Sequence, residues 1–154
     1  MTLSKFARYA LYAALDMARA GDEPVTVNRV AEPHGIPPTA LAKVFQRLVR
    51  AGIAIGTRGV GGGYRLARPR GSITVLDVVS VFEPPRPPGQ CLLSGRVGDE
   101  NCPTPETCGI RHLFDEIDEQ MRYTMASVTL DTLARRTAPK TSPVEVVRAA
   151  GTRR

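Results

Sequence analysis

In the first fifty residues, apolar side chains recur three and four positions apart, a spacing that predicts amphipathic helices. The first helix is expected from Ser4, a candidate N-cap, to near Gly21. A second is expected over 26–32, where Pro33 should end it because proline has no amide hydrogen. A third is expected over 38–51, beginning with a proline. The predicted apolar stripe of the first helix is Phe6, Ala7, Ala10, Leu11, Ala14, Leu15 and Ala18.

The third helix separates apolar and polar side chains onto opposite faces. At about 100° per residue, the buried stripe consists of Leu41, Val44, Phe45 and Leu48. The opposite face is polar and basic and carries Thr39, Lys43, Gln46 and Arg50. A short helix, a turn containing glycine and a second helix with a basic face are typical of a helix-turn-helix, whose second helix enters the major groove of DNA. An ordinary helical hairpin with a solvated face fits the same pattern.

A glycine-rich stretch, GVGGG, joins two segments of alternating polarity at 53–58 and 64–68. This pattern predicts a β-hairpin directly after the third helix, the position of a wing. Arg58 precedes the bend and Arg65 follows it, where guanidinium groups can meet phosphates or a narrow minor groove. A nucleotide-binding loop is disfavoured: the dinucleotide fingerprint would need glycine where Tyr64 stands, and the P-loop pair Gly-Lys does not occur.

The second half begins with a short predicted helix over 74–82 and then changes composition. Residues 84–109 are rich in Pro and Gly, and a long helix is expected over 110–135. Its apolar stripe fits packing against its own domain or a two-fold dimer seam, and we favour the seam. The apolar stripe of this long helix consists of Leu113, Phe114, Ile117, Met121, Met125 and Val128. Residues 137–154 have few apolar side chains to bury and are expected to be a mobile tail.

Length and charge narrow the function. The 154 residues suit one domain, with or without an added dimerisation element. With no apolar run of membrane-spanning length and no signal peptide, we expect a cytoplasmic protein without membrane contact. Residues 1–70 contain eleven Lys or Arg and four Asp or Glu, a balance of +7, whereas residues 71–154 have a balance of −1. This asymmetry favours a phosphate-binding half joined to a neutral oligomerising half.

Three cysteines, Cys91, Cys102 and Cys108, lie within one segment and indicate ligands or redox thiols rather than disulfides. Their spacing does not fit zinc, whose cysteine ligands usually stand two to four positions apart. A metal-free thiol switch and incidental cysteines both remain open. A cysteine nucleophile with His112 as base is disfavoured because no orienting group or oxyanion site accompanies it. We therefore do not expect an enzyme.

Together these features resemble winged-helix transcription regulators of the Rrf-two type, which include the iron–sulfur cluster regulator and the nitric-oxide-sensitive repressor. The resemblance covers residues 1 to about 135. It rests on RYALYAALDMA, on HGIPPTALAKVFQRLVRAGI, on the wing RGVGGGYRLAR, and on loop cysteines followed by a long helix. It implies a mainly α fold with a small β-hairpin wing and a long dimerisation helix. It also implies a homodimer bound to a palindromic operator in double-stranded DNA.

Carried over by position, the resemblance puts Thr39 and Lys43 on the recognition helix and makes Arg58 the wing arginine of the minor groove. Ala42 stands where the iron–sulfur cluster regulator has an acidic residue that filters targets, so operator choice does not transfer. Arg8 stands where some nitric-oxide sensors supply an acidic fourth ligand from the partner's first helix.

The resemblance also implies an iron–sulfur cluster, [2Fe-2S] or [4Fe-4S], held by Cys91, Cys102 and Cys108. His112 is a candidate fourth ligand, one position out of the family register. The spacing between Cys91 and Cys102 is also longer than is usual in the family. The expected organisation is a winged helix-turn-helix domain (1–83), a cysteine-bearing sensor loop (84–109), a dimerisation helix (110–136) and a tail (137–154). The expected function is a repressor that senses nitric oxide, redox state or iron–sulfur status; the alternative is a regulator with a metal-free switch or no cofactor.

Overall fold

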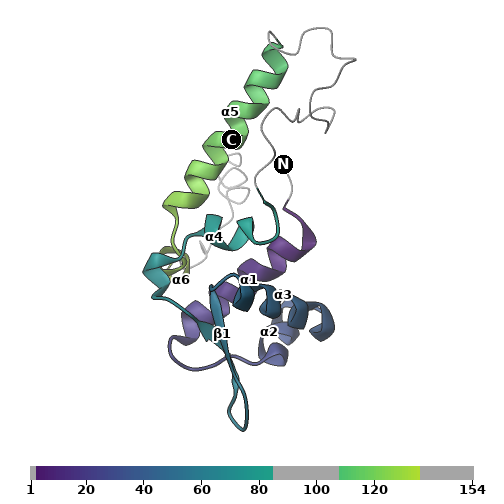
Figure 1. Cartoon of the computed structure of the whole chain (residues 1–154), viewed down its shortest axis with the longest axis vertical. Helices are drawn as coiled ribbons and strands as arrows, with labels where there is room; N and C mark the ends of the chain where they lie inside the picture. Colours follow the sequence, from purple (N-terminus) through teal and green to yellow (C-terminus); the bar gives the residue numbers. More distant parts are fainter. Residues whose placement is uncertain (1–2, 85–107, 136–154) are drawn as a thin grey trace, which may run out of the picture.

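The computed structural model describes residues 3–84 and 108–135, which are mainly helical with one antiparallel hairpin. The hairpin projects from one end of the molecule and α5 from the other (Figure 1). Within these ranges no helix is both long and apolar enough to span a bilayer. The predicted fold class, a winged helix-turn-helix, is confirmed. The elements in chain order are α1 (Lys5–Ala20), α2 (Val27–His34), α3 (Pro38–Arg50), β1 (Ala54–Thr57), β2 (Gly63–Leu66), the 3₁₀ turn η1 (Arg70–Ser72), α4 (Val75–Ser80), α5 (Gly109–Ser127) and α6 (Leu130–Arg135).

Helix α1 has the predicted ends, but its buried face is rotated from the predicted stripe. The Ser4 hydroxyl accepts a hydrogen bond from the Ala7 amide at 3.2 Å and caps the helix. Phe6, expected inside, is 44% exposed, whereas Ala13 and Met17 are completely buried. The helix packs against α3, α4 and α6, and its alanine-rich face lets these neighbours approach closely. Larger side chains on its edges remain partly exposed.

Helix α2 continues through Pro33 to His34, so the prediction that Pro33 ends it is wrong. A proline in the last turn of a helix removes one backbone hydrogen bond and leaves the earlier ones intact. Gly35, in the left-handed conformation with φ 61°, ends the helix instead. Its amide donates to the Ala31 carbonyl, which also accepts the Ile36 amide at 3.0 Å. This closure produces the tight turn into α3.

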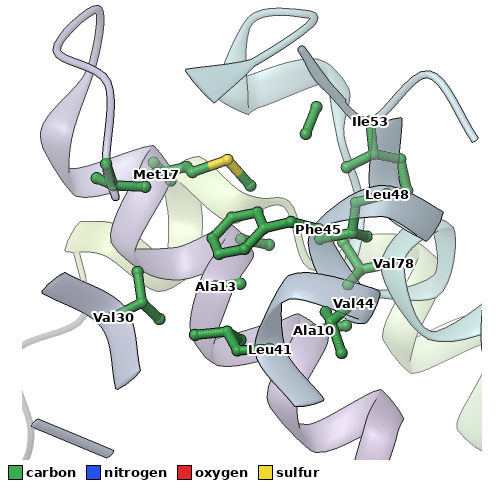
Figure 2. Packing of buried hydrophobic residues seen from close by; sticks show 14 of the residues in the cluster. Ala10, Ala13, Met17, Val30, Leu41, Val44, Phe45, Leu48, Ile53 and Val78 are labelled. Carbon is green, nitrogen blue, oxygen red and sulfur yellow. The ribbon is translucent and has the colours of Figure 1, made fainter. Parts of the chain in front are cut away.

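The apolar face of α3 supplies the centre of the core. The predicted stripe of Leu41, Val44, Phe45 and Leu48 is confirmed, because all four side chains are fully buried. Figure 2 shows the Phe45 ring pointing toward α1 beside Met17. Truncating a buried phenylalanine usually costs about 3–5 kcal/mol of folding stability, so burial of this stripe fixes how α3 sits on the domain.

The prediction of a single helix over 110–135 is wrong in one respect, because this segment forms two helices, α5 and α6. Val128 after α5 is extended, with φ −102° and ψ 115°. Its carbonyl accepts the Val75 amide at 2.8 Å, and the Leu130 amide donates to the Ile73 carbonyl at 2.9 Å. These hydrogen bonds join two distant segments of the chain and replace helical ones. They anchor the C-terminal end of α5 beside the start of α4.

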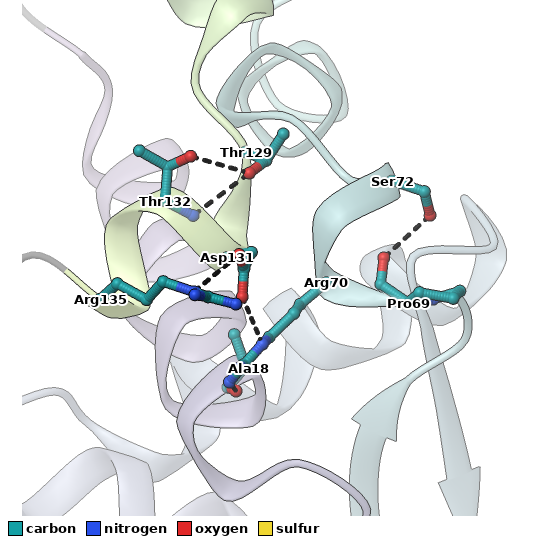
Figure 3. A network of polar contacts seen from close by, with 8 residues as sticks. All are labelled: Ala18, Pro69, Arg70, Ser72, Thr129, Asp131, Thr132 and Arg135. Carbon is teal, nitrogen blue, oxygen red and sulfur yellow. Dashed lines mark hydrogen bonds and ion pairs between the residues drawn. The ribbon is translucent and has the colours of Figure 1, made fainter.

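Polar contacts fasten the chain after the wing to α1 and α6 (Figure 3). Arg70 of η1 donates to the Ala18 carbonyl at 3.1 Å, and its Nε lies 2.7 Å from an Asp131 carboxylate oxygen. The other oxygen of Asp131 lies 2.9 Å from Nε of Arg135. The root of the wing is therefore tied to two helices.

Candidate nucleic-acid interface

The outer face of α3 carries the predicted recognition-helix residues. Pro38 occupies the first turn, where its missing amide costs nothing because that group has no helical partner. The opposite face of the helix is completely buried, so the outer face is held toward solvent. The exposed residues on it are Thr39, Lys43, Gln46 and Arg50. The helix thus offers hydroxyl, amide, ammonium and guanidinium groups on one side.

Strands β1 and β2 form the predicted wing, though each is shorter than the segment expected from sequence. Thr57 pairs with Gly63, which leaves residues 58–62 as the tip. Arg58 begins the tip and Arg65 lies on β2, and both side chains are exposed. Val60 at the tip is wholly exposed. The hairpin therefore ends in an apolar side chain preceded by an arginine.

Two glycines of the wing stand where no larger residue fits. A Cβ at Gly62 would lie 2.4 Å from the Thr57 carbonyl oxygen, and one at Gly63 would lie 2.7 Å from the Val25 carbonyl oxygen. Both neighbours are backbone atoms, which cannot rotate away as a side chain can. The run GVGGG thus allows close approach of backbone atoms in this hairpin. A phosphate-binding loop would need the N-terminus of a helix directly after the glycines, but here the strand β2 follows.

A pair of stacked aromatic rings joins α3 to the wing. The Phe45 and Tyr64 ring centroids lie 4.2 Å apart, with their planes inclined by 13°. The backbone of Tyr64 also exchanges two hydrogen bonds of 2.8 Å with Val25, in the connection between α1 and α2. The sequence pattern does not indicate this role for Tyr64, although an aromatic residue directly after the glycine run is the signal that points to it. Through Tyr64 the wing is fixed to both α3 and that connection.

The basic side chains of the first half fall into two groups. Arg68 pairs with Asp77 at 3.9 Å, and Arg70 pairs with Asp131. Arg47 also has an internal partner, the Val81 carbonyl. The other group makes no ion pair with any carboxylate in residues 3–84 and 108–135. It includes Lys5 and Arg8 on α1, and on α3 and the wing it consists of Lys43, Arg50, Arg58 and Arg65. The four cations on α3 and the wing lie close together along the chain and are available to an external anion.

The candidate cluster ligands are only partly described. Cys91 and Cys102 lie outside the described residues. Cys108 is the N-cap residue of α5 and is half-buried. The exposed His112 lies one helical turn later, and its amide donates to the Cys108 carbonyl at 3.1 Å. The described part of the chain gathers no three His, Cys, Asp or Glu side chains around a metal position.

The tight approach of the wing to Val25 gives a stability prediction. Gly63→Ala should lower the free energy of unfolding by about 1–3 kcal/mol, because the added methyl group forces β2 away from backbone atoms. Gly71→Ala is the matched control, since its Cβ meets nothing within 4 Å, and it should stay within about 0.5 kcal/mol of the unsubstituted chain. Urea denaturation measures both. Equal stability of the two variants would contradict the packing described here.

Known proteins are similar to this chain in sequence and in architecture. The chain is 32% identical over 136 residues to the HTH-type transcriptional regulator IscR of Xenorhabdus nematophila, covering 88% of this chain and 80% of that protein. It is 30% identical over 135 residues to the protein aau3 of Rhizobium meliloti strain 1021, covering 88% of this chain and 86% of that protein. The structure of CymR, the global cysteine regulator of B. subtilis, superposes with a TM-score of 0.72 at 25% identity, covering 90% of this chain and 99% of that one.

The family model described as Rrf2, iron-dependent transcriptional regulator, matches residues 3–136, which include all of the described residues and the segment between them. The T. potens IscR structure adds agreement in fold, with a TM-score of 0.68 at 20% identity over 100% of this chain and 93% of that one. By these matches, and with the helix-turn-helix and wing in place, the chain belongs to the Rrf2 family of DNA-binding transcriptional regulators and is not an enzyme.

Proposed function

We propose that the chain is a homodimeric repressor that binds a palindromic operator and responds to the state of its cysteine segment. The observation that carries the DNA-binding surface is the division of the basic side chains. Lys43, Arg50, Arg58 and Arg65 make no ion pair within residues 3–84 and 108–135, while other arginines of the same half are used inside the fold. Cations left without internal partners on one helix and its adjoining wing suit a polyanion.

On this surface each side chain has a part that follows from its chemistry. Thr39, Lys43 and Gln46 stand on successive turns of the outer face of α3, from which hydroxyl, ammonium and amide groups can reach base edges in the major groove. Arg50 at the end of the helix and Arg65 on β2 would contact phosphates. Arg58 at the wing tip would enter the minor groove, whose narrow regions attract guanidinium groups.

The exposed apolar side chains of α5 support the dimer. No residue of this 19-residue helix is buried, and its main packing partner is α4. Leu113 is 53% exposed and Ile117 is 49% exposed, with Phe114 beside them. Apolar residues repeated along one helix face are covered most simply by the same face of a second copy, which forms a two-fold seam. Two winged domains related by that axis would read a palindrome.

The donor set fits an iron–sulfur cluster, since thiolates are the usual ligands of such clusters. Cys91, Cys102 and Cys108 would hold it, with His112, one turn beyond Cys108 on α5, as candidate fourth ligand. When bound, the cluster would supply a reaction centre for nitric oxide or oxidants. Its gain or loss can change operator affinity only by the difference in its binding to the two dimer states.

Arg58 provides the first test. Arg58→Ala should weaken binding to a duplex selected from a random-sequence pool by about 1–3 kcal/mol, the usual loss for a sequence-reading arginine. Arg135→Ala removes the same charge from α6, where Arg135 pairs with Asp131, and serves as the control. Fluorescence anisotropy measures both affinities. An unchanged affinity for Arg58→Ala would remove Arg58 from the interface.

The seam is tested at Ile117. Ile117→Glu should weaken self-association by about 2 kcal/mol or more, a roughly thirtyfold higher dimer dissociation constant, because a charge would be buried in the interface. Analytical ultracentrifugation measures this constant, and Glu116→Gln is a control at a neighbouring exposed position. A monomeric unsubstituted chain at all accessible concentrations would rule out the seam.

The cofactor is tested by anaerobic purification. The unsubstituted protein should be brown, contain iron and absorb visible light, and Cys102→Ala should lose this absorption because one thiolate ligand is missing. A colourless, iron-free anaerobic preparation would contradict the cluster and leave the metal-free thiol switch or a regulator without cofactor.

A further inference from the structure

Arg47 belongs to the recognition helix but is turned toward the protein. Its guanidinium carbon lies 4.3 Å from the centroid of the Phe82 ring, and one of its terminal nitrogens donates a hydrogen bond to the Val81 carbonyl. At about 100° per residue, Arg47 stands to one side of Gln46 and of the outer face of α3. Its position and partners therefore separate it from Lys43 and Arg50, which have no ion-pairing partner within residues 3–84 and 108–135.

The chemistry of both contacts suits a guanidinium group. A planar cation is attracted to the face of an aromatic ring and can still donate in its own plane. Val81 directly follows the last residue of α4, and carbonyls at a helix C-terminus lack helical donors and carry partial negative charge. Arg47 supplies such a donor and places positive charge at this helix end. The recognition helix is thus connected to the C-terminal end of α4.

The segment that contains the residues contacting Arg47 is also held by the start of α1. One oxygen of the Glu83 carboxylate accepts the Ser4 backbone amide at 2.5 Å, and Ser4 is the N-cap of α1. The segment 81–83 therefore lies between the recognition helix and the start of α1. In the sequence, the next residues lead to Cys91 and Cys102.

We propose that Arg47 is a positioning residue that couples segment 81–83 to the orientation of α3. The Arg47–Phe82 contact then contributes to operator affinity although Arg47 does not touch DNA. This inference rests on the proposed DNA-binding function. It also identifies a route by which a change in the cysteine-bearing segment reaches the base-reading surface, because any displacement of segment 81–83 acts directly on α3.

A double-mutant cycle on the full-length protein tests the coupling. Arg47→Ala and Phe82→Leu should each weaken binding to the selected duplex by about three- to thirtyfold, and the double variant should bind no more weakly than the weaker single variant. The two substitutions should fail to add because both remove the same contact. Circular dichroism and urea denaturation verify that each variant is folded under the assay conditions, with Arg47→Gln replacing Arg47→Ala if the latter unfolds.

The salt dependence of binding distinguishes positioning from phosphate contact. Arg47→Ala should leave the slope of log affinity against log salt unchanged, whereas Arg50→Ala should make it shallower by about one. Arg47→Lys should not restore affinity, because an ammonium group cannot stack and donate as a planar fork does.

Three results would overturn the inference while leaving the DNA-binding proposal intact: unchanged affinity of Arg47→Ala, additive effects in the cycle, or a shallower slope with rescue by lysine. The last would make Arg47 a phosphate contact. Absence of salt-dependent DNA binding by the unsubstituted chain would overturn both proposals.

Discussion

The stacking of Phe45 on Tyr64 is the contact on which the rest of the structure depends. Phe45 is fully buried at the centre of the core, and Tyr64 lies in the second strand of the wing, with its backbone paired to Val25. A recognition helix and a wing can act as one surface only if their relative position is fixed, because preorganised contacts avoid ordering costs on binding. One aromatic pair connects the core, the helix and the hairpin, and the glycines beside Tyr64 allow the backbones to approach closely enough for it to form.

Around this rigid unit, the arginines divide between holding the fold and facing outward. Arg70 fastens the chain after the wing to α1 and α6, and Arg47 fastens α3 to the end of α4. Charged side chains used in this way are partly neutralised or satisfied by their partners. The cations on the outer face of α3 and on the wing make no ion pair within residues 3–84 and 108–135, so their charge is available to a partner outside the protein. The same residue type thus serves two purposes, and its surroundings decide which.

Much of this organisation could be predicted from sequence because local patterns dominate it. The periodic stripe around Phe45 specifies α3, and the glycine run between two alternating segments specifies the wing. The end of α2 was misplaced for a local reason, because Pro33 is tolerated in its last turn, whereas the interruption of the last helix comes from tertiary contacts. The break after α5 depends on Val128 and Leu130 bonding to residues 73–75, although Thr129, whose hydroxyl accepts the Thr132 amide at 3.2 Å, was a readable cap for a new helix. The partners of Arg47 lie more than thirty positions away, and no local pattern indicates them.

The central claim is that α3 and the wing, held together by the aromatic pair, meet adjacent grooves of duplex DNA in two symmetric copies. Hydroxyl-radical footprinting on the selected duplex tests this most directly, because the radical attacks sugars lining the minor groove. Two protected minor-groove patches are expected, one for each wing, related by the symmetry of the operator. Absence of minor-groove protection, or a single asymmetric patch, would contradict it.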